Sequence, residues 1–494
     1  MHPLAVALRT GGDARLRLPP GQLFDSYGCR AVPEKHLSYS SCTASTISGD
    51  AWHYLNQVQA RIDAFPSESE NSIRKRILEY IGCSDVDVAL GPSGTDMELL
   101  VLYLGLLRSS QLSNILIGPE EVGSGITNAA GGCYFSEITA NGYAVNRGGV
   151  VSGFEIYDID VCCLPVRDPV DGSVLGSSNV KDAIHRRIKA DLKAARRTIL
   201  HMVYRTKTGL VVPDVKTIMA IRSAYPDAVD IVVDCCQLRM SPAELKALLD
   251  AGVMVIITGS KFLGGPPFSS ALLIPSNLAA RFTWGGVPPE GLAEFFTRGA
   301  LPASWSHFDG ALPIASNPGL LLRWEAALFE LERFAELPEN ELVETAHLFH
   351  GAFQTLAEQS RVLHDISPYP ASSRSTSYYD LTIKTFELNH PSVSMDISHA
   401  YEIYRDLYTI LHPDGISISE YERSCMSTIC HLGQPVRVRQ HSDGRWVATL
   451  RIALSAKDFV RLAGLSTQQK TRIFHSELGV IVSKLSMLVQ GVKA

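Results

Sequence analysis

The sequence predicts an α/β protein with a large, mostly parallel sheet between helices and a smaller α+β domain after it. From about residue 67 to 325, short apolar runs bounded by turn residues alternate with amphipathic helical patterns. This alternation is typical of a parallel sheet with helices on both faces. From about residue 319 the pattern is a helix followed by mixed helices and strands. The 494 residues suffice for two or three domains of roughly 100–200 residues each.

The elements follow one another along the chain. The N-terminal residues are irregular and contain the polar cluster SYSSCTASTIS (38–48). Helices are predicted at 50–64, 71–82, 96–110, 214–225, 241–252 and 319–336. Strands are predicted at NILIG (114–118), RTILHMVY (197–204), DIVVDC (230–235), VMVIITG (253–259) and WVATLRIALS (446–455). We therefore expect an N-terminal segment (1–66), a large domain (67–325) and a small C-terminal domain (326–494).

Composition excludes several classes of partner. The net charge is −6 without a basic stripe, which argues against nucleic acid or an acidic membrane surface. No apolar run approaches the ~20 residues that span a bilayer, and no signal peptide is expected. The ten cysteines include two adjacent pairs and no C-x-x-C, which suits neither a disulfide framework nor a metal centre. We expect a reduced, cytoplasmic protein.

Two apolar runs end in residues that can carry chemistry. Asp234 is the last residue but one of DIVVDC (230–235), and Lys261 lies two residues after VMVIITG (253–259). Ligands of open α/β sheets bind at the carboxyl ends of the strands, so we expect both side chains at one site. Gln237, Thr258 and Ser260 lie close to them in sequence. An amine, a carboxylate on a neighbouring strand and hydroxyls suit pyridoxal 5'-phosphate (PLP), whereas a helix cap and a solvated loop lysine are the plainer alternatives.

A phosphate site is expected upstream of this pair. In LGPSGTDMELL, Ser93, Gly94 and Thr95 stand directly before a long apolar helix. Free N–H groups and the positive end of the helix dipole there would hold a dianion. A plain N-cap by Ser93 or Thr95 is the alternative.

An arginine stands within a late apolar strand. TLRIALS places Arg451 in its middle, where an unpaired guanidinium is costly. A clamp on a substrate carboxylate would satisfy it, and so would an internal acidic partner.

The order of these motifs resembles the fold-type I PLP enzymes of the class V aminotransferase and cysteine desulfurase group. The likeness runs from about residue 67 to 325 and returns at 449–455. It implies a sheet of the seven-stranded type, PLP as the cofactor, an amino-acid substrate and a homodimer with its site at the subunit interface. It also implies that residues 1–66 contribute to the small domain and to the mouth of the site.

The resemblance assigns roles to individual residues. PSGTD resembles the group's Ser-Gly-x-Thr phosphate loop. TGSK resembles its Ser-x-His-Lys motif, so Lys261 would carry the cofactor while Thr258 and Ser260 contact phosphate. VDCCQ resembles its Asp-x-x-Gln motif, which implies Asp234 at the ring nitrogen and Gln237 near the ring hydroxyl.

Three further stretches extend the resemblance. TKTGLVVP (206–213) resembles an Asn-Glu-x-Gly-x-x-x-Pro turn, with Thr206 replacing the asparagine as a cofactor contact. TRGALP (297–302) lies where the group has a stretch donated to the partner subunit's phosphate. TLRIALS resembles the strand whose arginine, here Arg451, binds the substrate carboxylate.

The chain departs from the group where an aromatic residue or a histidine usually stacks on the cofactor ring. GPEEVGSGITNAAGGCYF offers Glu121, Val122 and Gly123, with no aromatic residue before Tyr134. Residues 360–448 match no motif of the group. The cover of the ring and the reaction therefore cannot be copied from the group.

Several reactions remain open. The shared chemistry is a Schiff base with the substrate (an external aldimine) and a carbanion at Cα. It leads either to transamination or to elimination, replacement or carbon–carbon bond formation. For the second class, S-adenosylmethionine is among the candidate substrates, and a second small-molecule substrate is a further option. Specialised biosynthesis is the context that such chemistry would fit. Cysteine desulfuration would need Cys425 or Cys430 as a mobile nucleophile, although two structural cysteines are the simpler interpretation. A PLP-fold protein that binds without catalysis is the remaining alternative.

Overall fold

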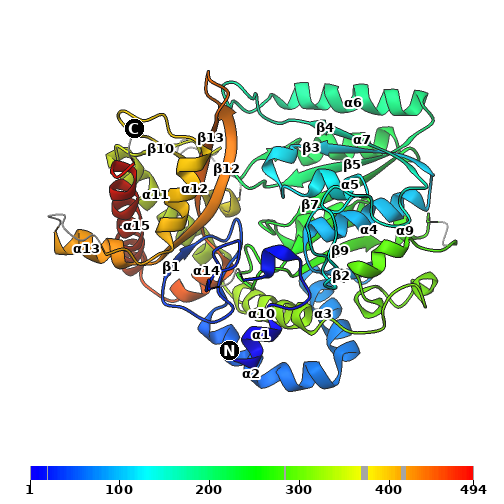
Figure 1. Ribbon diagram of the computed structural model, residues 1–494, viewed down its shortest axis with the longest axis horizontal. Helices are drawn as coiled ribbons and strands as arrows, with labels where there is room; N and C mark the ends of the chain where they lie inside the picture. The colour runs from blue at the N-terminus through cyan, green and yellow to red at the C-terminus, as the bar shows by residue number, and fades with distance from the viewer. Residues whose placement is uncertain (1, 19–20, 283–284, 369–376, 413–418, 493–494) are drawn as a thin grey trace.

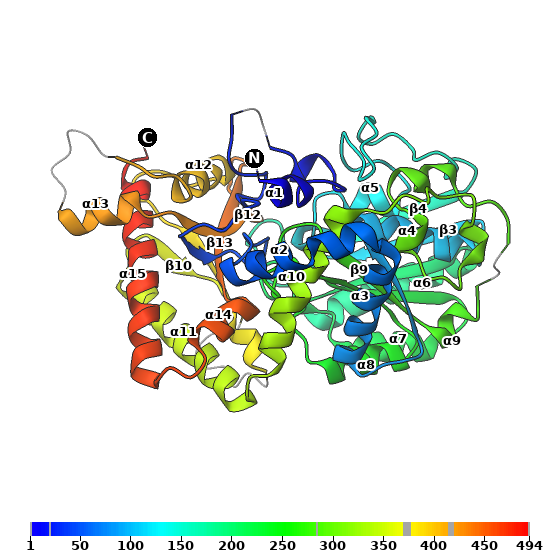
Figure 2. The same ribbon diagram turned by 90° about the horizontal axis from the view of Figure 1, so that it is seen from below.

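A computed structural model of the chain describes residues 2–18, 21–282, 285–368, 377–412 and 419–492. Two sheets lie side by side in Figure 1, the larger on the right and the smaller on the left. Helix α10 lies between the two parts in Figures 1 and 2. The predicted domain boundary after residue 325 falls inside this helix, which belongs to neither sheet. The exact boundary between the domains therefore stays a prediction.

The bounds of the elements follow from the backbone. The strands are β1 (Leu37–Tyr39), β2 (Val86–Gly91), β3 (Gln111–Ile117), β4 (Asp158–Leu164), β5 (Arg197–Tyr204), β6 (Val211–Val212), β7 (Val229–Cys235), β8 (Met254–Thr258), β9 (Ser270–Pro275), β10 (Leu363–Asp365), β11 (Ile383–Leu388), β12 (Cys430–Gln440) and β13 (Trp446–Ala453). The α-helices are α1 (Pro3–Ala7), α2 (Gly49–Ala64), α3 (Pro66–Ile81), α4 (Gly94–Leu106), α5 (Ile126–Ala130), α6 (Ser177–Lys193), α7 (Val215–Ala224), α8 (Pro242–Asp250), α9 (Ser276–Ala279), α10 (Pro318–Ala335), α11 (Glu339–Gln359), α12 (Ile397–Leu407), α13 (Glu420–Ser427), α14 (Ala456–Leu462) and α15 (Thr467–Gln490).

The larger sheet has the strand order β2-β9-β8-β7-β5-β3-β4, with the short β6 paired to β5. Strands β4, β3, β5, β7 and β8 pair in parallel, and β9 runs antiparallel to both of its neighbours. The predicted mostly parallel sheet between helices is confirmed. Sequence reasoning missed β2, β4 and β9, which complete its edges.

Helices cover both faces of this sheet. Along β8, Val255 and Ile257 pack in the cluster that contains the buried faces of α3, α6, α7 and α8. Met254 and Ile256 point to the other face and pack in the cluster that contains α4. Because side chains alternate along a strand, a five-residue apolar run serves two hydrophobic layers.

The smaller sheet has the order β1-β12-β13-β11-β10. Strands β10 to β13 pair antiparallel, whereas β1 adds to β12 in parallel and comes from the other end of the chain. Helices α11, α12 and α15 gather beside it (Figure 1). Part of the N-terminal segment is thus a strand of the C-terminal sheet.

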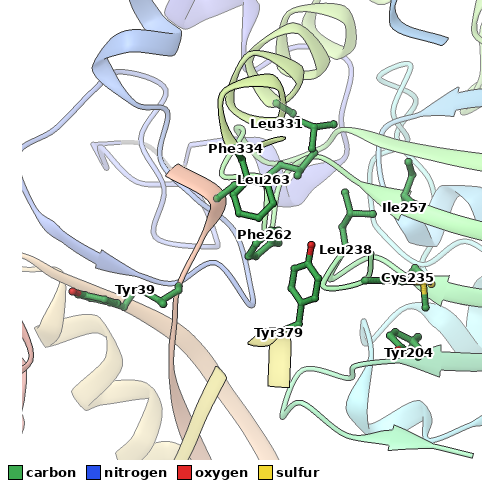
Figure 3. Packing of buried hydrophobic residues seen from close by; sticks show 14 of the residues in the cluster. Tyr39, Tyr204, Cys235, Leu238, Ile257, Phe262, Leu263, Leu331, Phe334 and Tyr379 are labelled. Atoms are coloured by element: carbon green, nitrogen blue, oxygen red, sulfur yellow. Dashed lines mark hydrogen bonds between the residues drawn. The ribbon is translucent and has the colours of Figure 1, made fainter. Parts of the chain in front are cut away.

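Aromatic side chains anchor the loop after β8 at the junction of the two parts. Phe262 lies edge-on to Phe334 of α10 and to Tyr379, with ring centroids 5.2 and 5.4 Å apart, as Figure 3 shows. Phe459 of α14 contacts the same ring. The residue before Phe262 is Lys261, so this packing fixes the backbone that carries the lysine.

Arg239 joins four segments behind the end of β7. Its guanidinium is 1% exposed and donates to Gln237 Oε1 (2.6 Å), Ser41 Oγ (2.8 Å), Leu454 O (2.8 Å) and Thr382 Oγ1 (2.9 Å). No described carboxylate pairs with it, and burial lowers its pKa to about 10. The large sheet, the N-terminal segment and the small sheet therefore meet at one buried cation.

Within the described part of the chain, no helix combines the length and apolar character needed to cross a membrane.

Candidate active site

A cavity of about 240 Å³ lies where β7 and β8 end and α4 begins. Seven predicted residues line it: Ser93, Gly94, Thr95, Asp234, Thr258, Ser260 and Lys261. They come from three segments that are up to 168 positions apart, from Ser93 to Lys261, but adjacent at the carboxyl ends of the strands. The fold thus brings the predicted amine, carboxylate and hydroxyls into one space.

Asp234 and Lys261 lie on neighbouring strand ends. Strands β7 and β8 are parallel, with Asp234 opposite Ile256, so the lysine-bearing loop leaves the sheet beside the carboxylate. Asp234 Oδ1 accepts a hydrogen bond from the backbone N–H of Cys236 at 2.8 Å, which orients the acid. Among the described residues, no ion pair involves Lys261. Within the described part of the chain, Lys261 thus lines the cavity without an ion pair to hold its amine elsewhere.

The amino end of α4 closes another side of the cavity. Ser93 caps the helix, and Ser93 and Asp96 bond each other's backbone N–H. A side chain at Gly94 would place its Cβ 2.6 Å from Cys236 Sγ, so only glycine lets the helix start this close to β7. The N–H groups of Gly94 and Thr95 belong to the first turn and have no partner within the helix. Burial, together with Asp13, raises the pKa of Asp96 to about 7.

Two predicted residues line a smaller space of about 20 Å³ next to the same acid and lysine. Thr206 is 2% exposed and donates through Oγ1 to Glu121 Oε2 at 2.9 Å. Gln237 is 3% exposed and donates to Cys42 O at 2.8 Å. Both hydroxyl and amide are thus held in place by protein atoms beside Asp234.

Arg451 lies behind the cavity and does not line it. It is 0% exposed, and its terminal nitrogens donate to Lys207 O and Thr43 Oγ1, each at 3.2 Å, and to Gln434 O. Its Nε has no hydrogen-bond partner among the described residues. Lys207, Thr43 and Gln434 all line the cavity, so the guanidinium is one residue away from it, without an acidic partner.

Sequence reasoning missed Lys207. This residue lines the main cavity, the smaller space and a neighbouring cleft, and its Nζ donates to Val122 O at 2.5 Å. Burial, followed by the charges of Arg451 and Lys261, lowers its pKa to about 7. It occupies the second position of TKTG, where the resembling motif has an acid. This replacement of an acid by a lysine was the feature of the sequence that could have identified Lys207 as a residue of the site.

The N-terminal segment, which the resemblance implied at the mouth of the site, supplies another wall through residues that the sequence did not single out. Arg15, Tyr27 and Thr43 line the cavity. Arg15 pairs with Asp13 at 2.6 Å, donates to Ser93 Oγ at 3.4 Å and lies 5.2 Å from the centre of the Phe268 ring. A cation thus stands at the amino end of α4. No local pattern marks Arg15, since its position depends on how residues 13–46 dock.

The segment after β3 provides no aromatic cover. Glu121 is buried, lines the smaller space and not the main cavity, and is bonded to Arg167 (2.6 Å) and to Thr206 and Thr208. Gly123 lines the cavity, and a Cβ added to it would lie 3.4 Å from Thr95 Oγ1. The aromatic residues that do line the cavity are Tyr27 and Phe268. Phe268 adopts a φ of 74°, a costly conformation for a bulky residue that occurs where surroundings impose it.

Three other predicted candidates lie elsewhere. Cys425 and Cys430 are 1% and 0% exposed and do not line the cavity, and burial raises the pKa of both thiols. Arg298 of the TRGALP stretch pairs with Asp309 at 2.5 Å and donates to nearby carbonyls of its own loop. These contacts favour structural cysteines and an arginine engaged within its own chain.

No protein-family model matches the chain, and no curated protein does. Among solved structures, the chain is similar to a lysine-to-alanine variant of C-DES with glycine covalently linked to its PLP cofactor. The TM-score is 0.53 at 13% identity over 92% of this chain and 96% of that one. A complex of C-DES, a cystine C–S lyase, with cysteine persulfide has a TM-score of 0.48 at 13% identity over 89% and 97%. A putative histidinol-phosphate aminotransferase from Erwinia carotovora atroseptica has 0.46 at 9% over 91% and 97%. The first of these likenesses shows the fold.

Proposed function

We propose that this chain, which has the fold of the fold-type I PLP-dependent enzymes, is itself a PLP-dependent enzyme that acts on an amino-acid substrate. The observation that carries the proposal is the meeting of Asp234 and Lys261 on adjacent parallel strands in one cavity with the amino end of α4. A carboxylate can hold a protonated pyridine, an amine can bond to an aldehyde, and the amino end of a helix can hold a phosphate.

The residues present fit PLP. Ser93, Gly94 and Thr95 would hold the phosphate together with Arg15, and the glycine is required by the close approach of Cys236. Thr258 and Ser260 would add hydroxyls on the lysine side of the same space.

The remaining contacts would fall on the ring. Asp234 would pair with the ring nitrogen, Gln237 and Thr206 would lie near the ring hydroxyl, and Lys261 would bond to the aldehyde carbon. When bound, PLP supplies an electron sink that stabilises negative charge at the substrate Cα.

The chain's own residues do the rest. Lys261 Nζ would be the base that takes a proton from the substrate Cα and returns it. Lys207, with Arg451 behind it, supplies positive charge for the substrate carboxylate. Thr43 and Tyr27, on the N-terminal segment, would limit access of water to the reacting atoms.

The reaction belongs to one of two classes. Transamination is one. Elimination, replacement or carbon–carbon bond formation at the substrate side chain, on a substrate such as S-adenosylmethionine and with or without a second small molecule, is the other. Lys207 stands where the class V aminotransferase pattern has an acid, and Gly123 stands where that pattern has an aromatic residue or a histidine. These two departures favour elimination, replacement or carbon–carbon bond formation. The buried Cys425 and Cys430 speak against desulfuration. We further propose a homodimer in a reducing, cytoplasmic setting, where ten free cysteines are stable.

The first test is the absorbance of the purified protein with PLP, followed by borohydride reduction and peptide mass spectrometry. A yellow band that bleaches, and a pyridoxyl group found on Lys261, would support the proposal. Lys261→Ala should lack both, and Asp234→Ala should bind PLP more weakly while remaining folded. A colourless wild type that PLP cannot reconstitute would refute the enzyme assignment. Full conversion of the cofactor to its amine form by amino acids would select transamination.

A further inference from the structure

A cleft of about 540 Å³ adjoins the cofactor cavity between the two sheets. One wall consists of the loops that follow β3 and β4, and the other of α12, β12 and β13. In Figure 1 the upper ends of β12 and β13 stand next to the loop after β4. Gln440 donates to Pro169 O at 2.8 Å and ties the two walls together. The volume lies within the roughly 300–1,000 Å³ of small-molecule sites.

The walls of the cleft are largely apolar. Six side chains give it this character: Val122, Ile397, Tyr401, Val436, Val438 and Trp446, with prolines between them. Tyr401 is 43% exposed and Trp446 is half-buried, so two aromatic rings remain accessible. Accessible aromatic and aliphatic surface within a concave site is what an apolar ligand group needs.

Most of the charged groups on these walls already have partners. Arg167 is held by Glu121 at 2.6 Å and by Thr208 at 3.0 Å. Glu120 accepts from the backbone of Val166 at 2.7 Å. The Arg437 guanidinium lies over the Trp446 ring, 5.8 Å from its centre, at the exposed rim. The surface left for a ligand is therefore apolar rather than ionic.

The cleft adjoins the cofactor cavity and shares lining residues with it. Ser124 and Lys207 line both spaces, and Val122 lines the cleft and the smaller space beside Asp234. Gly123, between Val122 and Ser124, lines the cavity and adds no side chain there. A molecule held near Lys261, with its carboxylate toward Lys207, would therefore direct its side chain into the cleft.

We propose that this cleft binds the side chain of the substrate, which is an amino acid with a large aromatic or long aliphatic side chain. The proposal rests on the proposed function, because it needs the substrate amine at Lys261. It goes further in naming the substrate class.

The test uses the PLP-loaded full chain and a graded series of amino acids: L-alanine, L-2-aminobutyrate, L-norvaline, L-norleucine and L-phenylalanine. Kd is measured from the change in absorbance of the bound cofactor. Each added methylene should lower Kd roughly three- to fourfold, and L-phenylalanine should bind at least as well as L-norvaline.

Two variants remove the apolar walls, and one serves as a matched control. In Tyr401→Ser and Trp446→Ser, the ratio of Kd between L-alanine and L-norleucine should fall at least threefold. Tyr421→Ser removes an aromatic residue that is 56% exposed on α13, away from the cleft, and should leave this ratio unchanged. PLP content and thermal midpoint, measured on each variant, separate the loss of a wall from loss of the fold.

The outcomes are distinct. A wild-type Kd that stays flat or rises along the series would overturn the substrate class, and so would a spectrum that no amino acid changes. Equal loss of the ratio in Tyr421→Ser would overturn the assignment to this cleft. If the protein takes up no PLP at all, the proposed function itself fails, and the inference falls with it.

Discussion

At the scale of single residues, Arg15 is the side chain that we propose as a contact for the phosphate group of the cofactor. Its guanidinium lies at the amino end of α4, 3.4 Å from Ser93 Oγ, within the same chain. Arg298, which the resemblance would give to a partner subunit, is instead paired with Asp309. Arg15 is also paired, with Asp13 at 2.6 Å, but it lines the cavity, and we therefore propose it as a phosphate contact from within the chain.

Comparing PLP with pyridoxal, which lacks the phosphate, tests this contact. The Kd of pyridoxal divided by the Kd of PLP should fall at least tenfold in Arg15→Ala, because a charge-assisted hydrogen bond to the phosphate contributes about 1.5–3 kcal/mol. Arg15→Lys should restore part of the ratio. Arg298→Ala is the control and should leave it unchanged. A reduced ratio in Arg298→Ala alone would assign the phosphate contact to the TRGALP stretch.

Lys207 predicts a pH dependence for carboxylate binding. Its pKa is lowered to about 7, first by burial and then by Arg451 and Lys261, so above pH 7 the free protein holds the amine mostly neutral. A carboxylate needs the charged form and must bring a proton with it. Calorimetry with hexanoate, which has no amino group, should show Kd rising up to about tenfold per pH unit from pH 7.5 to 9. Lys207→Arg should make Kd independent of pH, and a flat wild-type profile would exclude Lys207 as the carboxylate partner.

At the scale of elements, β11 contains a buried cation that weakens the fold. Lys384 is 0% exposed, its Nζ has no hydrogen-bond partner among the described residues, and burial lowers its pKa to about 8. The unfolded chain titrates near 10.5, so the cost is fully present below pH 8 and disappears as the pH rises toward 10.5.

Lys384→Met should therefore stabilise the protein. The expected gain in the free energy of unfolding is about 1–3 kcal/mol at pH 7, and it should shrink between pH 8 and 10. Urea unfolding at several pH values measures it. Lys246→Met, in an exposed pair with Asp250, is the control and should leave the free energy of unfolding nearly unchanged at each pH. A loss of stability in Lys384→Met would mean that the ammonium has a function in the fold.

The sequence predicted the central elements of the large sheet better than its edges. Strands β5, β7 and β8 are mostly apolar and almost entirely buried, which is typical of strands covered on both faces. Strand β4 is an edge strand with partly exposed residues and two aspartates, so its pattern is weak. Strand β9 follows two prolines and a glycine pair, which made it look like a loop after the lysine.

The same contrast holds for the cavity. Asp234, Lys261 and the Ser93–Thr95 turn lie at the ends of regular elements, where position along the chain predicts position in space. Arg15, Tyr27 and Lys207 reach the cavity through loops and long-range docking. No local periodicity encodes such contacts, so they could be found only once the segments were placed together.

At the scale of the whole molecule, Arg239 is the point where the parts are joined. Through four hydrogen bonds it binds the loop after β7, the N-terminal segment, and the residues next to the start of β11 and the end of β13 in the small sheet. Arg239→Met keeps much of the volume but leaves buried acceptors unsatisfied, and we expect a loss of about 2–5 kcal/mol in the free energy of unfolding.

Urea unfolding followed by tryptophan fluorescence measures this loss. The Arg445→Met variant removes an exposed arginine paired with Asp443 and Asp396, and should leave the free energy of unfolding nearly unchanged. If the Arg239 and Arg445 variants were equally stable, the four hydrogen bonds would not hold the parts together.

The pairing of β1 with β12 has a consequence for how the protein is made. Residues 37–39 find their strand partners only at 430–432, so the N-terminal segment has no sheet to join until most of the chain has left the ribosome. Arg15, Tyr27 and Thr43 belong to that waiting segment. The cofactor cavity is therefore among the last features to form during synthesis, although these three wall residues are translated before any strand of the large sheet.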